Sequence, residues 1–548
     1  MVVKNYVLIL LIGLLAMGSA VGQNRYAIHY KFKPQTTYSL DNPSEFLSPM
    51  AVERKSRFGV TLDSLDLPVS TKNIEKINPL IIDILYHSNW LNASIVIANP
   101  EAIEQILDLD IIEDVVLAAP GFVENGRIST KTGEKGFSFN LKSKKNKSEG
   151  APFEFQNQLL GIPEMHEEGY RGKGVTVAVF DAGFPGVNTI PALSHIIEEG
   201  RLLGGKNFVH PWDEDIFKYN QHGSNVLSLI ASNDPESLLA GAPESNYILC
   251  ITEEVPTEFR IEEYNWVKAA EYSDSLGVDI INSSLGYWDF DDPEMDYSFE
   301  DMDGETALIT KGANIASDKG ILVVTSVGNY GSRGASSLTA PADAKGIIAV
   351  GSVNGDLERS AFSSQGPTAD GRVKPELTTN GNQVWLIRSN GNLGRATGTS
   401  FSAPQIAALA AGLWQAKPDW NKEKMLNALL ESADNFESPD NDFGYGIPNF
   451  TKAYLGEILN IPLEEKEEDW KVFPNPISGN SLFIYFGNNQ QGEFSLFDMQ
   501  GKVLSQLKVK RNSPKEPFLI DLPVLSNGMY IVEMQAGNQV RRTKLLKN

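Results

Sequence analysis

The sequence predicts an α/β protein whose core is a buried, largely parallel sheet. Residues 175–180 (VTVAVF) and 321–327 (ILVVTSV) are short, nearly continuous apolar runs, as expected of strands that are covered on both faces. Asp181 directly follows the first run, and Gly328 with Asn329 follows the second. Functional groups gather at the carboxyl ends of strands in such sheets. We therefore expect Asp181 and Asn329 to belong to one site.

A candidate nucleophile lies further along the chain. Ser400 stands among small residues in the segment 398–404 (GTSFSAP), which runs on into an apolar, helix-like stretch. A serine hydroxyl needs an adjacent base and a group that orients this base. Of the six histidines, only His222 begins an amphipathic run with helical spacing, at residues 222–230 (HGSNVLSLI). Asp181, His222 and Ser400 are thus the candidate catalytic residues.

These segments resemble the subtilases, the subtilisin-like serine peptidases. The resemblance is carried by the heptapeptide at 398–404 and by His-Gly-Ser at 222–224, where Ser224 replaces the threonine of the family pattern but keeps a hydroxyl. The chain order Asp, His, Ser is that of subtilisin and differs from the orders in chymotrypsin and the α/β-hydrolases. The resemblance implies a subtilisin-like catalytic domain over residues 151–455, with a mostly parallel sheet and helices on both faces.

The resemblance also implies the role of each residue. Ser400 would attack a peptide carbonyl, His222 would move the proton, and Asp181 would orient His222. The Asn329 side chain and the Ser400 N–H would form the oxyanion hole. The implied substrate-binding residues are Ser284, Leu285 and Gly286, at the end of the strand-like segment 278–286, together with Tyr330 beside Asn329. An extended peptide would pair along the first three as an added strand.

The region before the catalytic domain predicts a separate small domain. Within residues 23–125, strand-like pieces at 26–30 and 93–97 alternate with a helical stretch around 101–107, which favours an α+β domain. Its position resembles that of an inhibitor-like subtilase pro-domain, so the protein would be made as a zymogen. The lysine-rich segment 126–150 is then expected to be a linker that is cut; the alternative is an uncleaved surface loop.

The first 22 residues predict a secretory signal peptide. Lys4 precedes an apolar core at residues 7–16, and small residues follow at 18–20. The core is too short for a typical membrane span, although a retained anchor is the alternative. No later segment is apolar and long enough to cross a bilayer, so no transmembrane span is expected.

The C-terminal region predicts a β-sandwich after a charged linker. The linker covers residues 456–469, and in residues 470–548 short alternating runs recur between turn residues. The segments 472–476 (VFPNP), 498–502 (DMQGK) and 525–530 (LSNGMY) resemble the C-terminal sorting domain of the type IX secretion system. The resemblance implies the type IX secretion machinery as a partner and a secreted, extracellular or cell-surface location.

Composition excludes other classes of function. The net charge of −23, from 47 basic and 70 acidic residues, argues against nucleic acid as a partner. Cys250 is the only cysteine, which excludes an intrachain disulfide, and its apolar neighbours indicate a buried strand. No His-Glu-x-x-His motif and no calcium-loop spacing occur in the sequence. We expect no metal site and no required cofactor, while structural calcium stays open.

The sequence therefore predicts a secreted serine endopeptidase that hydrolyses peptide bonds of protein or peptide substrates through an Asp-His-Ser triad and an acyl-enzyme. Two alternatives stay open at this stage. One is a catalytically inactive, peptide-binding subtilase-like module, which would not react with a fluorophosphonate. The other is a surface adhesin that acts through the C-terminal sandwich and would lose binding when the residues after Asp469 are deleted.

Overall fold

The computed structural model describes residues 23–33, 38–122, 153–459, 470–487, 489–511, 517–537 and 539–547. The expected signal peptide, the linker 126–150 and most of the linker 456–469 lie outside the described residues. The chain divides into two compact units, one formed by Met1–Ile162 with Arg171–Asn449 and the other by Pro163–Tyr170 with Phe450–Asn548.

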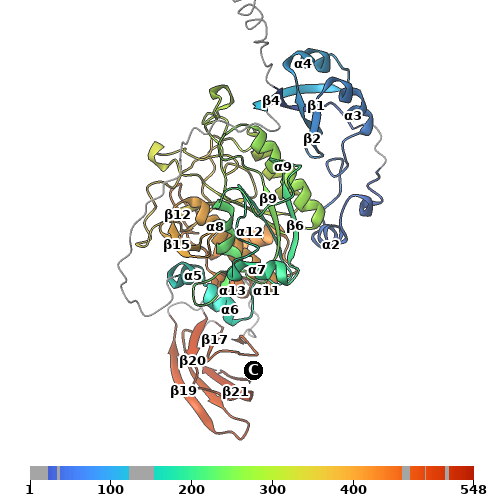
Figure 1. Cartoon of the computed structure of the whole chain (residues 1–548). Coiled ribbons are helices and arrows are strands. Elements are labelled where there is room, and N and C mark those ends of the chain that lie inside the picture. Colours follow the sequence, from blue (N-terminus) through green and yellow to red (C-terminus); the bar gives the residue numbers. More distant parts are fainter. Residues whose placement is uncertain are drawn as a thin grey trace, which may run out of the picture. The chain divides into compact units, whose positions relative to one another are not determined.

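The core of the first unit is a seven-stranded sheet with the order β13-β12-β11-β10-β5-β9-β6 (Figure 1). Every neighbouring pair is parallel, which confirms the predicted fold class. The strands are β5 (Thr176–Asp181), β6 (Leu202–Asn207), β9 (Asn246–Ile251), β10 (Ile280–Ser283), β11 (Leu322–Ser326), β12 (Ile348–Val353) and β13 (Leu377–Asn380).

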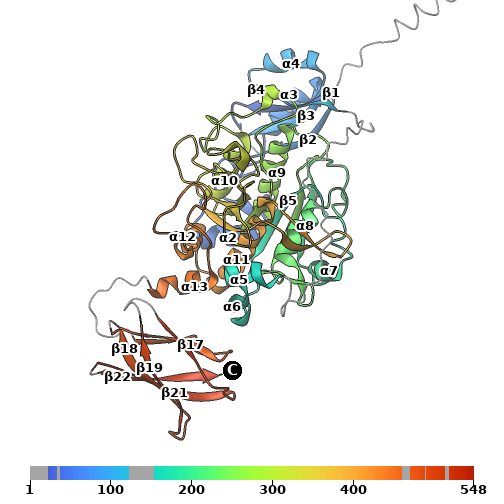
Figure 2. The same cartoon turned by 90° about the vertical axis from the view of Figure 1, so that its left-hand side faces the viewer.

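Helices cover both faces of this sheet because its strands are apolar on both sides. Ala178 and Phe180 of β5 belong to a core with Trp266 of α9 and Ala313 of α10, whereas the alternate residues of β5 face the opposite side, where α8 and α11 contact the sheet. Figure 2 shows these layers from the side. Apart from those of the N-terminal region, the helices of this unit are α5 (Glu154–Leu160), α7 (Pro191–Glu198), α8 (His222–Ala231), α9 (Ile261–Leu276), α10 (Leu308–Asp318), α11 (Ala403–Ala416) and α12 (Lys422–Ser432). Helix α6 (Ile162–Glu167) belongs, except for Ile162, to the second unit.

Short elements complete this unit. Two small hairpins consist of β7 (Asn233–Asp234) with β8 (Leu238–Leu239) and of β14 (Val384–Ile387) with β15 (Leu393–Ala396). The 3-10 turns are η1 (Pro43–Glu45), η2 (Asn78–Leu80), η3 (Pro293–Met295), η4 (Gly331–Arg333) and η5 (Thr399–Phe401). Cys250 is a free, fully buried thiol on β9, as expected, and burial raises its pKa to about 12.

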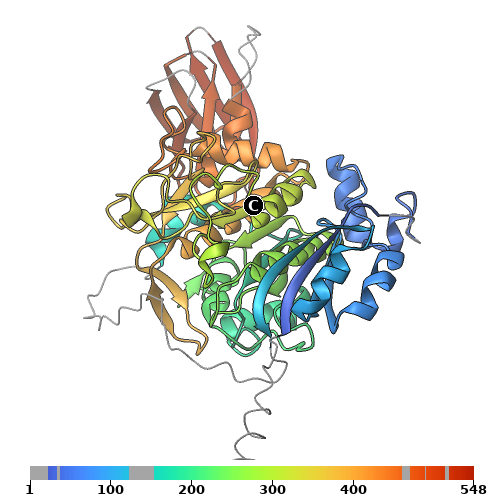
Figure 3. The same ribbon diagram turned by 90° about the horizontal axis from the view of Figure 1, so that it is seen from above.

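The N-terminal region forms a four-stranded antiparallel sheet with the order β2-β3-β1-β4. One face of this sheet packs on its own helices, through residues such as Tyr26 and Val96. The other face contributes Ala27 and Ile95 to a core with Tyr264 of α9, and Figure 3 shows these strands lying along helices that cover the seven-stranded sheet. The elements are β1 (Gln23–Tyr30), α2 (Pro49–Phe58), α3 (Thr71–Ile77), β2 (Asp83–Ser88), β3 (Ala93–Ala98), α4 (Pro100–Leu107) and β4 (Ile112–Phe122).

The second unit contains two antiparallel sheets that share one apolar core, as predicted for a β-sandwich. The sheets have the orders β16-β17-β20 and β19-β18-β21-β22. Their strands are β16 (Trp470–Phe473), β17 (Ser481–Phe486), β18 (Gln491–Phe497), β19 (Val503–Lys510), β20 (Phe518–Asp521), β21 (Gly528–Ala536) and β22 (Gln539–Lys547), preceded by helix α13 (Phe450–Leu459). Within the described residues, no helix has the length and apolar character needed to cross a membrane.

Close packing of α9 and α10 generates a stability prediction. Replacing Gly312 of α10 by alanine would put a methyl group 2.5 Å from Val267 Cγ2, so the free energy of unfolding should fall by about 1–3 kcal/mol. Urea unfolding followed by tryptophan fluorescence measures this, in a chain that also carries Ser400→Ala to prevent the expected self-digestion. Gly355→Ala is the control, because a Cβ there meets nothing within 4 Å; equal curves for the two variants would contradict the packing.

Candidate active site

The structure brings Asp181 and His222 into direct contact. Asp181 is the last residue of β5 and is fully buried, and both of its carboxylate oxygens lie 2.9 Å from His222 Nδ1. The Ala182 N–H also donates to Asp181 Oδ1, at 2.7 Å. This arrangement holds the Nδ1 side of the ring and leaves Nε2 as the nitrogen that can accept a proton from elsewhere.

Helix α8 can approach Asp181 because it begins with His222 and Gly223. A Cβ on Gly223 would lie 2.4 Å from the Gly183 carbonyl oxygen and 2.9 Å from Asp181 Cβ, so a larger residue would push the helix away. The hydroxyl of Ser224, which departs from the family's threonine, donates to the Pro185 carbonyl at 2.7 Å. The substitution thus keeps a hydroxyl that holds the start of α8.

Ser400 lies in the η5 turn immediately before α11. In the described conformation its hydroxyl donates to the Ser284 carbonyl at 3.2 Å and not to His222. The Ser284 hydroxyl in turn donates to the Ser400 carbonyl at 2.8 Å. The ring of Phe401, the next residue, lies 5.5 Å from the His222 ring between centroids. Catalytic hydrogen bonds are often long or unformed in structures without substrate, so this geometry leaves the role of Ser400 a prediction.

Asn329 is exposed, and it is held by the residue before Ser400. Its Oδ1 accepts from the Thr399 N–H at 3.0 Å and from the Thr399 hydroxyl at 3.1 Å. With Oδ1 fixed in this way, the orientation of the amide is set and its Nδ2 donors are available on the other side. Thr399 was not among the residues that the sequence pointed to.

The predicted substrate-binding residues lie beside this group. Ser284 contacts Ser400 as described, and the Leu285 carbonyl accepts from the Ser326 hydroxyl at 3.2 Å. A Cβ on Gly286 would lie 2.1 Å from Thr339 Oγ1, so glycine is needed for the close approach of the Thr339 side chain. Tyr330 is half-buried, and the Arg333 guanidinium lies 4.5 Å from its ring centroid.

The acid Glu253 lies close enough to act on the electrostatics of the site. Burial favours the neutral form of His222, but the charge of Asp181 and the hydrogen bond to it outweigh burial, and Glu253 adds to them, so the pKa of His222 is raised. Burial raises the pKa of Glu253 itself to about 7, against hydrogen bonds from Tyr287 and Thr252. The Tyr287 hydroxyl donates to Glu253 Oε1 at 2.5 Å.

Sequence reasoning missed this acidic group. Glu253, Glu258 and Glu262 each place one carboxylate oxygen within 4.8 Å of the others, near the start of α9, where the helix dipole favours negative charge. Carboxylates at this spacing are chemically able to hold a divalent cation, although we had expected no metal site. The available signal was the acidic pair 253–254 just after the buried strand β9, at the same end of the sheet as Asp181, the last residue of β5.

Comparison with known proteins now adds to the geometry. Residues 172–446 match the model of the subtilase family, residues 25–132 match the Bacteroidota peptidase S8 propeptide domain, and residues 471–548 match the secretion system C-terminal sorting domain. The propeptide identifies a zymogen, and the type IX sorting domain indicates a protein that is secreted or attached to the cell surface.

Individual relatives agree with the family match. The major intracellular serine protease of Bacillus subtilis (strain 168) is 32% identical over 285 residues, which are 50% of this chain and 78% of that protein. Subtilisin of Bacillus pumilus is 29% identical over 298 residues, 54% of this chain and 96% of the relative. The crystal structure of MycP1 from Mycobacterium smegmatis aligns with a TM-score of 0.45 at 20% identity, covering 59% of this chain and 89% of that one. From the family match and the first of these relatives it follows that the chain belongs to the subtilase family and is a subtilisin-like serine peptidase.

Proposed function

We propose that this protein is a secreted serine endopeptidase that hydrolyses peptide bonds of proteins through Asp181, His222 and Ser400. Ser400 Oγ would attack the carbonyl carbon, and His222 Nε2 would take the hydroxyl proton and pass it to the leaving amine. Water would then release the acyl-enzyme by the same route. The Asn329 Nδ2 group and the Ser400 N–H would donate to the oxyanion.

The observation that carries this proposal is the contact between Asp181 and His222, at 2.9 Å for both carboxylate oxygens. A buried carboxylate that fixes one ring nitrogen selects the tautomer with a free Nε2 and stabilises the imidazolium that forms during attack. Rotation of the Ser400 side chain away from the Ser284 carbonyl would bring its hydroxyl to this base. A bound peptide that pairs with residues 284–286 would compete for the same carbonyl region and favour such a rotation.

Substrates and partners follow from the same proposal. Pairing through backbone atoms suits extended protein segments of varied sequence. The type IX secretion machinery would recognise the C-terminal sandwich. The net charge of −23 disfavours nucleic acid as a partner. The proposed chemistry uses no cofactor, and calcium would have a structural role if it binds.

The nucleophile is tested with protein that lacks residues 1–22. The parent chain is expected to react with a serine-directed fluorophosphonate, to hydrolyse casein and to shorten itself, whereas Ser400→Ala should do none of these. Ser402→Ala is the matched control, because this neighbouring serine is buried and its hydroxyl donates to Thr379. Mass spectrometry and gel labelling give the readouts. If the folded parent chain still fails to react after its prosegment has been removed, the result would favour a peptide-binding module.

The oxyanion role of Asn329 has a kinetic test. Asn329→Ala should lower kcat on the order of 100- to 1000-fold, by analogy with the loss of an oxyanion-hole asparagine in subtilisin, and should change KM little. Steady-state kinetics on a peptide substrate measure both constants. Asn390→Ala, at an exposed loop residue, should match the parent. A kcat like that of the parent in the Asn329 variant would remove this residue from the oxyanion hole.

The electrostatics of the site predict a pH dependence. Only neutral His222 accepts the Ser400 proton, and the pKa of His222 is raised, so kcat/KM should fall on acidification at a pH above the ordinary histidine value of 6.5. Glu253→Gln removes a carboxylate whose negative charge, present above its own pKa of about 7, helps to raise the pKa of His222, so the acid limb should move to lower pH. The pH profile of kcat/KM reports on the free enzyme. Glu236→Gln, at an exposed position, should leave the acid limb of the profile unchanged. An unchanged acid limb in the Glu253 variant would contradict the electrostatic effect of Glu253 on His222.

A further inference from the structure

Residues 38–70 of the prosegment, which we call the arm, make a second contact with the catalytic domain. The arm leaves the prosegment sheet between β1 and α3 and contains α2. Helix α2 contacts the last turn of α9, and the Ser48 N–H at its N-terminus donates to the Ser275 carbonyl at 2.9 Å. The arm is thus attached to the catalytic domain by backbone as well as by side chains.

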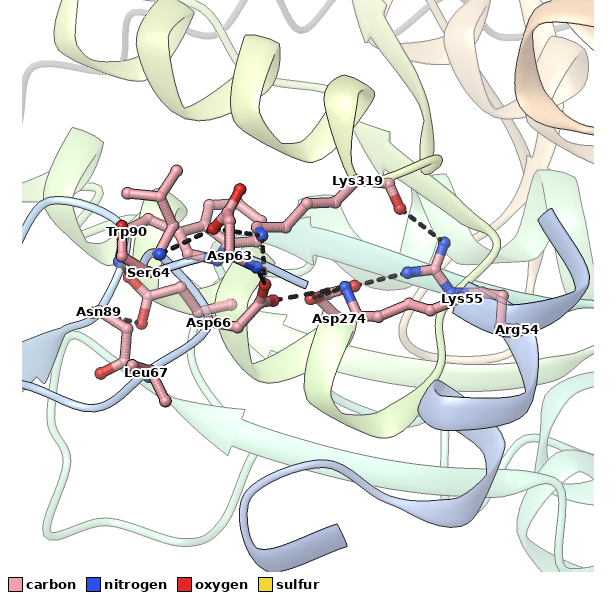
Figure 4. Close-up of polar contacts among 12 residues, drawn as sticks. Arg54, Lys55, Asp63, Ser64, Asp66, Leu67, Asn89, Trp90, Asp274 and Lys319 are labelled. Carbon is pink, nitrogen blue, oxygen red and sulfur yellow. Dashed lines mark hydrogen bonds and ion pairs between the residues drawn. The ribbon is translucent and has the colours of Figure 1, made fainter. Parts of the chain in front are cut away.

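Opposite charges meet across this contact (Figure 4). Arg54 and Lys55 of α2 bind the two carboxylate oxygens of Asp274 in α9, at 2.5 and 2.8 Å. In the other direction, Lys319 of the catalytic domain binds Asp66 of the arm at 2.9 Å. Lys55 also lies 3.5 Å from Asp66 and so links the two pairs. All five side chains are at most 4% exposed.

The position of Asp274 is unfavourable for α9 itself. Asp274 lies in the last turn of this helix, where the helix dipole disfavours an anion. Its carboxylate is compensated by Arg54 and Lys55, which both belong to the arm. A buried charge is costly when its partner is removed. Asp274 therefore makes physical sense as part of a binding site for the arm.

The arm also fits closely against two helix ends. Gly277 ends α9 with φ 91°, and a Cβ there would lie 2.9 Å from the Ala51 nitrogen of α2. Gly320, which follows the C-cap of α10, has φ 80°, and a Cβ there would lie 2.9 Å from Val60 Cγ2. We call Asp274, Gly277, Lys319 and Gly320 together the amino-edge site.

The name reflects the position of the site on the sheet. Asp274 and Gly277 shortly precede β10, and Lys319 and Gly320 shortly precede β11. Strand β10 runs parallel to β5, whose last residue is Asp181. The amino-edge site therefore lies where the parallel strands begin, and the Asp181–His222 pair lies where they end. The two are about one strand length apart, roughly 13–20 Å.

We propose that the amino-edge site is a second binding site for the prosegment, which keeps the cut prosegment on the catalytic domain and selects it by its pattern of charges. This proposal rests on the proposed function only in that the prosegment is cut from the peptidase. Two attachment points on one segment raise the effective concentration of each at its site. Complementary charges select the partner, and removal of one member of a buried charge pair raises the dissociation rate. A prosegment without the charges of the arm would leave much faster.

The test separates binding from catalysis. The full chain without residues 1–22 carries Ser400→Ala and a recognition sequence for a site-specific protease between residues 126 and 150; it is folded intact and then cut at that sequence. Prosegment release is followed by size-exclusion chromatography and by native mass spectrometry. The parent pair should stay together, while Asp66→Asn and Lys319→Met should each speed release at least tenfold. Because Ser400 is absent, the result does not depend on the proposed peptidase activity.

A double-mutant cycle assigns the effect to the ion pair itself. Asp66 also contacts Lys55, and Lys319 also contacts Asp63, but the two residues contact each other directly. The chain with both changes should therefore release its prosegment more slowly than the product of the two single effects. Lys319→Arg keeps the charge and should behave like the parent. Lys76→Met and Asp110→Asn are controls, because this exposed pair at 2.9 Å joins two residues of the prosegment. The melting curve of each uncut chain checks that it is folded.

Three outcomes would overturn the proposal. The first is that the parent prosegment leaves as soon as the chain is cut. The second is that the Asp66 and Lys319 variants release the prosegment at the parental rate. The third is that the increase in release rate in the double variant equals the product of the two single increases. The first would show that the arm does not retain the segment. The second and third would show that the charges do not form the binding site.

Discussion

The contact between Asp181 and His222 is the interaction on which the rest of the catalytic domain depends. A carboxylate at the end of a fully buried strand is stable only when its hydrogen-bonding partners are in place. Asp181 obtains them from His222 and from the Ala182 N–H. The imidazole reaches it because Gly223 lets α8 approach. The position of the inner strand β5 between β9 and β10 therefore sets where the His222 imidazole lies, and with it where the proposed nucleophile has to be.

Local patterns explain why much of this could be predicted from the sequence. Continuous apolar runs such as residues 175–180 specify strands buried on both faces, and the polar residue after each run falls at the carboxyl edge of the sheet. Asp181 and Asn329 were predicted as site residues in this way. The partner of the Ser400 hydroxyl was not, because the choice between His222 and the Ser284 carbonyl is a rotamer that only the packed structure determines.

Contacts between distant parts of the chain could not be predicted for a similar reason. Arg54 and Asp274 are separated by 220 residues, and each appears in the sequence as an ordinary charge on a helix. Glu253 lies just beyond the carboxyl end of a buried strand, but its raised pKa comes from burial, which no sequence pattern shows. Local residue patterns can predict where a strand begins and ends, whereas the partner of a charged side chain depends on the tertiary structure.

Asp274 and Glu271 show how the catalytic domain divides its contacts with the prosegment. Glu271 accepts from the Ser88 hydroxyl and from the N–H groups of Asn89 and Trp90, so two of these donors are backbone groups that many sequences could supply. Asp274 binds two cationic side chains, and as an anion in the last turn it destabilises its own helix. A residue that is unfavourable for its own helix indicates that another requirement, such as binding a partner segment, determines the residue at that position. Here the apolar face of the prosegment sheet and Glu271 provide contacts that depend little on particular prosegment side chains, while Asp274 and Lys319 tie the catalytic domain to one arm, at the edge of the sheet opposite the Asp181–His222 pair.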